Sequence, residues 1–345
     1  MHQISRGFLM ILKLCIEKLM HSENLESTLC EKVLDELLDP AANPLQIAAL
    51  LVLLRTKGES VDELSAFVNA LRKKMISIST DHPVLDIVGT GGDGLQSINI
   101  STGSAILAAS CGVKIAKHGN RSVSSLTGSA DVLEALGVNI QLTPEKIRKS
   151  IDTIGIGFFY SPNFHSTTQA LKSLRKQLNV QTTFNILGPL LNPADAKHFI
   201  LGVYDEKLLP IMADVLIQTG CDRSMVVHGM GLDEISCVGT TKMIEVNKQK
   251  KIEYIIDPVA LGLKPCLIAD LRGGDAKMNA HLLLETFKGK RGAIADTLIL
   301  NAAVASYLYG LGSSISECVI NATEKLYNGS ALTLLNSWIE FSHEQ

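Results

Sequence analysis

The sequence has no excess of basic residues and no apolar run long enough to span a bilayer. Its 32 Lys and Arg stand against 35 Asp and Glu, a net charge of −3, which disfavours a phosphate-tracking surface of the kind that binds nucleic acid. The longest apolar stretches are 45–54, which is too short for a span, and 292–311, which carries Asp296 and Asn301. We therefore expect neither a nucleic-acid nor a membrane partner.

Paired cysteines are also missing. The seven cysteines show no C-x-x-C spacing, in a chain too long to depend on disulfides, so we expect reduced thiols and no structural zinc. The apolar run at 7–12 is followed at once by charged residues, without a small-residue cleavage site, and no signal peptide is expected. These features predict a cytoplasmic protein.

What the chain does contain is typical of a packed globular protein. Hydrophobic residues make up 46% and charged residues 19%, with a mean hydropathy of +0.22, a composition that excludes intrinsic disorder. A length of 345 residues exceeds what one hydrophobic core usually organises, and predicts about two domains.

Residues 1–79 show the periodicity of helices and no strand pattern. Pro44 suits the first turn of a nearly all-apolar helix, and Ser60 with Glu63 forms a capping box before another. This block is predicted to be a small all-helical domain.

From Val84 onward, short apolar strands alternate with helical patterns, which implies a larger α/β domain with a mostly parallel central sheet flanked by helices. Helices are expected from near Ser101, over 129–136 and from Pro144 to Gly155. The lysines between the last two strands are interpreted as a solvated hairpin turn. The predicted strands are 84–88, 113–116, 138–142, 156–160, 199–203, 225–227, 242–246 and 252–256.

The sharpest local signal is the glycine-rich sequence GTGGDG at 89–94, which leaves a buried strand and precedes a helix start at 99–102. Glycines allow backbone N–H groups to curl around an anion, and a helix N-terminus adds unpaired donors, so a phosphate or pyrophosphate is the expected ligand. The dinucleotide and nucleoside-triphosphate motifs are not matched. A flexible turn is the alternative, and Ser101 is either an N-cap or a metal ligand.

The next strand is followed by KHGNRS at 117–122, with Ser124, Ser125 and Ser129 behind it. Two cations, an amide and several hydroxyls suit a multiply phosphorylated ligand better than a packing role. By itself, His118 is either a structural histidine or a ligand contact.

Two further sites are open to both a functional and a structural interpretation. Asp233 and Glu234 are adjacent carboxylates that would either bind magnesium or form a solvated turn. Arg175 lies beside the apolar side of a predicted helix, where it would either clamp a carboxylate or form a surface salt bridge.

Taken in order, these motifs resemble those of the anthranilate phosphoribosyltransferases over nearly the whole chain. The matching segments are QIAAL at 46–50, KGE at 57–59, DIVGTGGDG at 86–94, NIST at 99–102, KHGNRS at 117–122, GSADVLE at 128–134, FNILGPL at 184–190 and the pair Asp233-Glu234. The resemblance implies transfer of a 5-phosphoribosyl group from phosphoribosyl pyrophosphate to the amine of anthranilate, with release of pyrophosphate, in tryptophan biosynthesis.

The resemblance also implies an organisation. The helical domain, 1–79, would be joined by about 165–195, and the phosphoribosyl-pyrophosphate-binding domain would comprise 80–164 and 196–345. Two chains would pair into a homodimer through the helical domain. Mg²⁺, two ions per chain, would be the cofactor, and no covalent nucleophile or acid/base residue is expected.

The site residues implied by the resemblance fall into three groups. For phosphoribosyl pyrophosphate they are Gly89, Gly91, Gly92, Asp93, Asn99, Ser101, Thr102, Lys117, Gly119, Asn120 and Ser129, with Lys117 in an electrostatic role. For anthranilate they are Gly89, His118, Asn120, Arg175 and Pro189. For the metal they are Ser101, Asp233 and Glu234.

The chain departs from the family pattern at a few positions. Family members commonly show His-Pro-x-Met where this chain has His-Ser-Thr-Thr at 165–168, a glycine at Asn179 and an arginine at Gln181. Two alternatives to the transferase remain. One is a pyrimidine nucleoside phosphorylase-like enzyme, which the 117–122 loop disfavours. The other is a non-catalytic nucleic-acid-binding paralogue, which the net charge disfavours.

Overall fold

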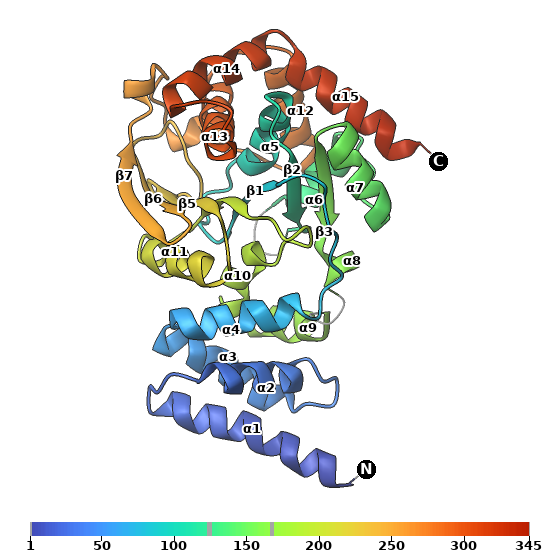
Figure 1. Cartoon of the computed structure of the whole chain (residues 1–345), viewed down its shortest axis with the longest axis vertical. Helices are drawn as coiled ribbons and strands as arrows, with labels where there is room; N and C mark the ends of the chain where they lie inside the picture. The colour runs from blue at the N-terminus through green and yellow to red at the C-terminus, as the bar shows by residue number, and fades with distance from the viewer. Residues whose placement is uncertain (1, 123–125, 166–168, 345) are drawn as a thin grey trace.

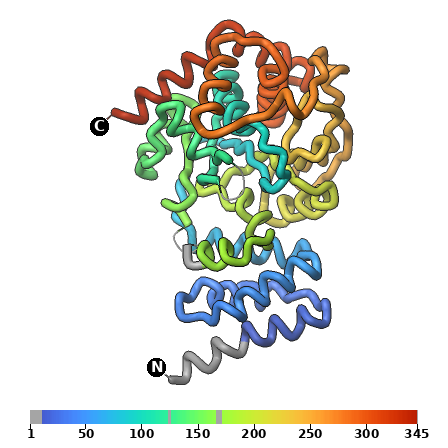
Figure 2. The backbone as a smooth tube through the Cα atoms, turned by 180° about the vertical axis from the view of Figure 1, so that it is seen from behind, coloured from blue at the N-terminus to red at the C-terminus, as the bar shows by residue number. Residues whose placement is uncertain are grey.

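The computed structural model describes residues 2–122, 126–165 and 169–344. A stack of helices forms the amino-terminal end, a sheet flanked by helices forms the rest, and the termini lie at opposite ends of the molecule (Figures 1 and 2). Within the described ranges, no helix combines the length and apolarity needed to cross a membrane. All seven cysteines are free, as expected.

Four helices make up the amino-terminal stack, and two of them begin as their sequences predict. The Asn43 side chain accepts the Leu45 N–H at 2.9 Å ahead of Pro44, and Ser60 and Glu63 form the expected capping box. The helices are α1 (His2–Met20), α2 (Ser27–Leu37), α3 (Pro44–Lys57) and α4 (Val61–Arg72).

Across the described residues, the sheet has seven strands in the order β3-β2-β1-β4-β5-β6-β7. The pairs among the first five are parallel, and β6 and β7 form an antiparallel hairpin at one edge, so the predicted mostly parallel sheet is confirmed. The strands are β1 (Leu85–Gly89), β2 (Ile115–Gly119), β3 (Ile156–Tyr160), β4 (His198–Gly202), β5 (Arg223–Gly229), β6 (Thr241–Asn247) and β7 (Lys250–Ile256).

Helices cover both faces of the sheet. Leu85 and Ile87 of β1 pack into one core together with α5 and α13, whereas Phe199 and Leu201 of β4 pack into a second core, which continues into the amino-terminal stack. The helices of this part are α5 (Ile100–Ser110), α6 (Ser129–Ala135), α7 (Pro144–Thr153), α8 (Ser161–Phe164), α11 (Leu208–Gln218), α12 (Ala276–Phe287), α13 (Ala293–Tyr309), α14 (Ile315–Tyr327) and α15 (Ser330–His343), with 3-10 turns η3 (Val259–Leu261) and η4 (Ile268–Leu271).

The segment after β3 returns to the amino-terminal stack. Its helices α9 (Gln169–Leu178) and α10 (Thr183–Leu187) lie against α3 and α4, followed by the 3-10 turn η2 (Gly188–Leu190) (Figure 1). Asn179, at the end of α9, has a φ of 50°, a left-handed conformation that asparagine tolerates better than most residues. The domain limits inferred from the resemblance remain predictions.

One predicted strand is wrong. Residues 138–142 are not paired in the sheet, although Val138, Ile140 and Leu142 are buried in alternation. The Asn139 N–H donates instead to Ser342 Oγ, in the last turn of α15, at 3.0 Å. The alternation of apolar and polar residues correctly indicated a segment buried on one side. It does not specify whether the backbone of that segment bonds to a strand or to the end of a helix.

Candidate active site

Two glycines on adjacent strands make room for the acidic pair. Gly89 ends β1 and faces Gly202 of β4 in register. A Cβ on Gly202 would lie 1.6 Å from the Asp233 carbonyl oxygen, and one on Gly89 would lie 2.2 Å from Asp233 Oδ2. Any side chain at these positions would displace Asp233, whose Oδ2 accepts the Gly91 N–H at 2.7 Å. The glycine-rich loop and the acidic pair, which are far apart in the sequence, therefore meet at the carboxyl ends of β1 and β4.

The second carboxylate joins the start of α5. Glu234 Oε1 accepts the Ser101 N–H at 3.3 Å, across a separation of 133 residues. Because α5 begins at Ile100, Asn99 holds the N-cap position, and the interpretation of Ser101 as the N-cap is wrong. The Asn99 side chain does not cap the helix; its Nδ2 donates to the Thr127 carbonyl at 3.1 Å.

Negative charge accumulates at this point. Burial, followed by repulsion from Asp93, raises the pKa of Asp233 to about 6, and burial, followed by repulsion from Asp233, raises the pKa of Glu234 well above its usual value. Burial lowers the pKa of Lys117, while attraction to Asp86 and Glu234 opposes that shift. A divalent cation would stabilise the ionised carboxylates, so the electrostatics favour a metal at this position.

The donor set fits magnesium completed by a substrate. Across 2–122, 126–165 and 169–344, no three His, Cys, Asp or Glu side chains form a ready metal-ligand set. Asp233 and Glu234 supply two carboxylates, and Mg²⁺ in phosphate-binding enzymes is commonly held by one or two carboxylates together with phosphate oxygens and water. Asp93 was expected to bind phosphoribosyl pyrophosphate, and its charge contributes to the repulsion that raises the pKa of both Asp233 and Glu234.

Strand β2 brings Lys117 and His118 to the same edge. Lys117 is buried, and its Nζ donates to the Ile87 carbonyl at 2.7 Å. The His118 ring lies 5.1 Å from that of His165, and burial keeps its pKa well below the usual value, so the imidazole is neutral near pH 7. Its Nε2 is buried and has no hydrogen-bond partner among the described residues. A neutral ring with one unpaired nitrogen suits a contact with a ligand.

An aspartate and an asparagine that the sequence analysis did not single out hold this edge together. Asp86 is fully buried in β1, where burial raises its pKa to about 6. It accepts the His118 N–H at 3.3 Å and Asn192 Nδ2 at 2.7 Å, and the same Nδ2 also donates to the Ala116 carbonyl at 2.7 Å. A carboxylate inside an otherwise apolar strand was the sequence signal that could have identified this pair.

The loop after β2 closes onto the start of α6. A Cβ on Gly119 would lie 2.0 Å from Ser129 Oγ, and the Asn120 carbonyl accepts the Ala130 N–H at 3.2 Å. Arg121 turns away to Glu134, with contacts of 2.6 and 2.9 Å, so its charge is already paired and it is not a free phosphate-binding cation. The predicted hydroxyls at 124 and 125 lie outside the described residues.

The predicted anthranilate residues lie on two parts of the chain: some are at the ends of β1 and β2, and the others are in the segment after β3. Arg175, on α9, donates from Nη2 to Asn185 Oδ1 at 3.3 Å and lies 5.7 Å from the centre of the Phe184 ring; Pro189 is buried in η2. Within the described part of the chain, no hydrogen bond joins Arg175 to His118 or Asn120. The altered residues at 166–168 lie outside it.

Gln181, in the segment after β3, lies against Gly92 of the glycine-rich loop. A Cβ on Gly92, whose φ is 88°, would lie 2.5 Å from Gln181 Nε2. This replacement for the family's common arginine thus places an amide directly over the glycine-rich loop. Thr102 is buried in the first turn of α5, and its hydroxyl has no hydrogen-bond partner in the part of the chain that the structure describes.

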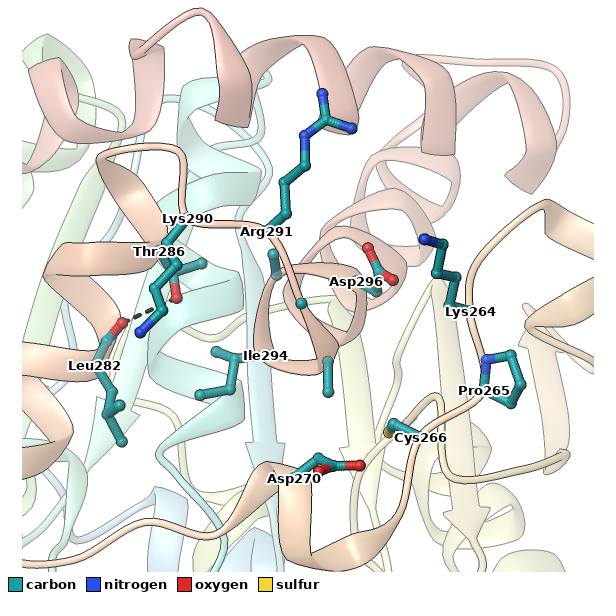
Figure 3. Close-up of a pocket in the computed structure, with 13 residues that line it drawn as sticks. Lys264, Pro265, Cys266, Asp270, Leu282, Thr286, Lys290, Arg291, Ile294 and Asp296 are labelled. Atoms are coloured by element: carbon teal, nitrogen blue, oxygen red, sulfur yellow. Dashed lines mark hydrogen bonds between the residues drawn. The ribbon is translucent and has the colours of Figure 1, made fainter.

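A cavity of about 430 Å³ lies elsewhere, beside the start of α13. Figure 3 shows the residues that line it, and two of its charged side chains have partners: the Arg291 guanidinium lies 4.6 Å from the centre of the Tyr327 ring, and Asp296 accepts the Lys264 backbone N–H. None of the predicted site residues lines this cavity.

Comparison with known proteins agrees with this geometry. Residues 13–75 match the model of the glycosyl transferase family, helical bundle domain, and residues 81–332 match that of the glycosyl transferase family, a/b domain. The anthranilate phosphoribosyltransferase of Chlamydia felis (strain Fe/C-56) is 43% identical over 335 residues, which are 97% of this chain and 97% of that protein. The chain belongs to the anthranilate phosphoribosyltransferase family.

Solved structures of family members share the fold. The anthranilate phosphoribosyltransferase of Thermus thermophilus superposes with a TM-score of 0.90 at 38% identity, covering 96% of this chain and 99% of that chain. The Saccharomyces cerevisiae enzyme in complex with phosphoribosyl pyrophosphate and Mg gives 0.87 at 29% identity, covering 96% and 97%. The same yeast enzyme in complex with 4-fluoroanthranilate gives 0.86 at 28% identity, with 96% and 97% covered.

Proposed function

We propose that this protein transfers the 5-phosphoribosyl group from phosphoribosyl pyrophosphate to the amine of anthranilate, in a Mg²⁺-dependent reaction of tryptophan biosynthesis. The observation that carries the proposal is the 2.7 Å hydrogen bond from the Gly91 N–H to Asp233 Oδ2. It joins an anion-binding loop to a metal-binding carboxylate, the combination that a magnesium pyrophosphate group requires. The yeast relative in complex with phosphoribosyl pyrophosphate and Mg supports the same assignment.

In this proposal, the donor lies along the ends of β1 and β2. The Gly92 backbone and the first turn of α5 would hold its phosphates, and Gly91 would act through its hydrogen bond to Asp233. Thr102 would pair its buried hydroxyl with a donor oxygen. The other donor contacts are those implied by the resemblance, namely Gly89, Asn99, Ser101, Gly119, Asn120 and Ser129.

Asp233 and Glu234, with Ser101, would hold the magnesium ions, two per chain. Bound magnesium would stabilise the negative charge that develops on the leaving pyrophosphate. Lys117 would act through Glu234, because its buried ammonium offsets the charge of that carboxylate. This is an electrostatic role and not a proton transfer.

Anthranilate would be held by its carboxylate. Arg175 has donors beyond the one bonded to Asn185, and a guanidinium binds a carboxylate with two parallel hydrogen bonds. His118, Asn120, Gly89 and Pro189 would surround the ring and the amine. An aromatic amine is uncharged near neutral pH, so it needs no strong base to act as nucleophile, and orientation by these residues supplies much of the rate.

The decisive activity test is the loss of anthranilate fluorescence on mixing protein, phosphoribosyl pyrophosphate and Mg²⁺. Omission of the donor is the control. Loss of signal only in the complete mixture supports the proposal. Phosphorolysis of a pyrimidine nucleoside, or salt-dependent retention on DNA without transfer, would support one of the two alternatives instead.

We also propose a cytoplasmic homodimer that pairs through the amino-terminal helices. Met20 and Leu45 are 67% and 78% exposed on α1 and α3, which leaves apolar side chains for a partner to cover. Light scattering should give a mass twice the 37.2 kDa of one chain. Replacing Leu45 with Glu should lower that mass, and a monomer at all concentrations would contradict the pairing.

A further inference from the structure

Two charged residues near the end of α3 reach from the amino-terminal helices toward the active site. Gly58, with a φ of 85°, ends the helix and turns the chain toward Glu59, which is 7% exposed. Arg55 Nη1 lies 3.3 Å from Glu59 Oε2. Burying a carboxylate costs free energy unless hydrogen bonds stabilise it. The groups that bond Glu59 and Arg55 therefore indicate what these two residues do.

The first connection leads to the anthranilate side. Glu59 Oε1 accepts the Thr183 hydroxyl at 2.7 Å, and both groups are buried. Thr183 begins α10, immediately after Thr182, whose N–H donates to Asn185 Oδ1 at 2.9 Å. The same Asn185 oxygen accepts Arg175 Nη2 at 3.3 Å. Glu59 therefore fixes the short helix against which the Arg175 guanidinium rests.

The second connection leads to the phosphate side. Arg55 Nη2 donates to the Tyr204 hydroxyl, and the guanidinium lies 6.0 Å from the centre of the Tyr204 ring. The Tyr204 N–H donates to Thr90 Oγ1 at 3.2 Å, and the Thr90 N–H donates to the Gly202 carbonyl at 2.9 Å. Thr90 belongs to the glycine-rich loop, so Arg55 supports that loop through Tyr204.

We propose that Arg55 and Glu59 are positioning residues that hold the glycine-rich loop and Arg175 at a fixed spacing. The inference rests on the proposed function, because it assigns one connection to each substrate. Neither residue needs to touch a substrate. A two-substrate transfer depends on the alignment of its reactants, and a shift of about 1 Å in one binding element can lower the rate about 100-fold.

Removal of single hydroxyls separates the two connections. Tyr204→Phe should raise the KM for phosphoribosyl pyrophosphate about fivefold, the equivalent of about one hydrogen bond, and leave the KM for anthranilate within about twofold. Thr183→Val should show the reverse selectivity. Glu59→Ala should raise both KM values, because it removes the carboxylate that bonds α10 and orients Arg55.

Glu63→Gln is a matched control. Glu63 is also a buried carboxylate in the amino-terminal helices, but it bonds Lys57 Nζ at 2.7 Å and the Leu25 N–H at 2.8 Å, away from the sheet. This variant should lower the thermal midpoint and leave both KM values within about twofold. A purely structural role for Glu59 would give the same result for Glu59→Ala.

The inference is overturned if Glu59→Ala matches Glu63→Gln in both KM values, or if Tyr204→Phe and Thr183→Val fail to act on different substrates. If Glu59→Ala does not fold, the two hydroxyl variants decide alone. If the wild-type protein shows no transfer, the proposed function fails separately. Titrations with Mg²⁺ plus pyrophosphate and with anthranilate then test the same selectivity as dissociation constants.

Discussion

Replacing Gly202 with Ala tests whether the close approach of Asp233 to the strand ends is needed for activity. The added Cβ would lie 1.6 Å from the Asp233 carbonyl oxygen and 2.4 Å from its carbonyl carbon. Non-bonded heavy atoms prefer separations of about 3.5 Å or more, so the backbone at Asp233 must retreat by about 2 Å. That displacement would break the 2.7 Å hydrogen bond from Gly91 to Asp233 Oδ2.

The expected effects are on stability and on donor use. Overpacking of this kind costs about 1–3 kcal/mol in the free energy of unfolding. Misplacement of a metal-binding carboxylate by about 1 Å or more should lower kcat/KM for phosphoribosyl pyrophosphate about 100-fold or more and raise the Mg²⁺ concentration needed for half-maximal rate. Both are measured from anthranilate fluorescence at a series of donor and Mg²⁺ concentrations.

Gly157→Ala is the matched control for this variant. Gly157 lies on β3, away from the acidic pair, and its added Cβ would lie 2.8 Å from Ile151 Cγ1. This variant should therefore lower the thermal midpoint without changing the Mg²⁺ profile. If Gly202→Ala folds and retains the wild-type kcat/KM and Mg²⁺ profile, the placement of Asp233 against β4 is irrelevant to catalysis and the reasoning is refuted.

Further predictions concern the charged groups of the site. Replacing Asp233 and Glu234 with Ala should cut turnover and weaken the Mg²⁺ dependence, and an unchanged metal profile would remove them from the site. Arg175→Ala should chiefly raise the KM for anthranilate, whereas an effect confined to the donor would contradict its assignment. Because the pKa values of Asp86 and Asp233 are raised to about 6, the folded state holds more protons than the unfolded state between about pH 4 and 6. These two groups should therefore lower the free energy of unfolding as pH rises through that window. Asp86→Asn removes one of them, so the free energy of unfolding of this variant, measured by denaturant titration, should depend less on pH there. Binding of Mg²⁺ plus pyrophosphate requires the ionised carboxylates, so its affinity, measured by calorimetry, should fall as pH drops below about 6; an affinity that stays constant well below that pH would contradict this.

The sequence predicted the main features of the fold because they depend on short-range patterns. The apolar strands, the capping box at Ser60 and the alternation of strands with helices are each encoded within a few residues. The false strand at 138–142 shows the limit of such patterns. Its alternation was real, but its hydrogen-bond partner, Ser342, is 203 residues away.

The active site was predicted at the level of motifs and not at the level of contacts. The glycine-rich loop and the acidic pair were each visible in the sequence, but their meeting depends on the register that sets Gly89 opposite Gly202. The roles of Asp86 and Asn192 depend on one buried hydrogen bond between distant residues. Asp86 is visible in the sequence as a carboxylate within an apolar strand, but its bond to Asn192, 106 residues away, is a property of the packed chain.

The most direct measurement is the anomalous difference map of a crystal soaked with phosphoribosyl pyrophosphate and Mn²⁺ as a substitute for Mg²⁺. We expect metal peaks bounded by Asp233, Glu234 and pyrophosphate oxygens, with the phosphates over the glycine-rich loop. Peaks elsewhere, or a donor bound away from the ends of β1 and β2, would contradict it.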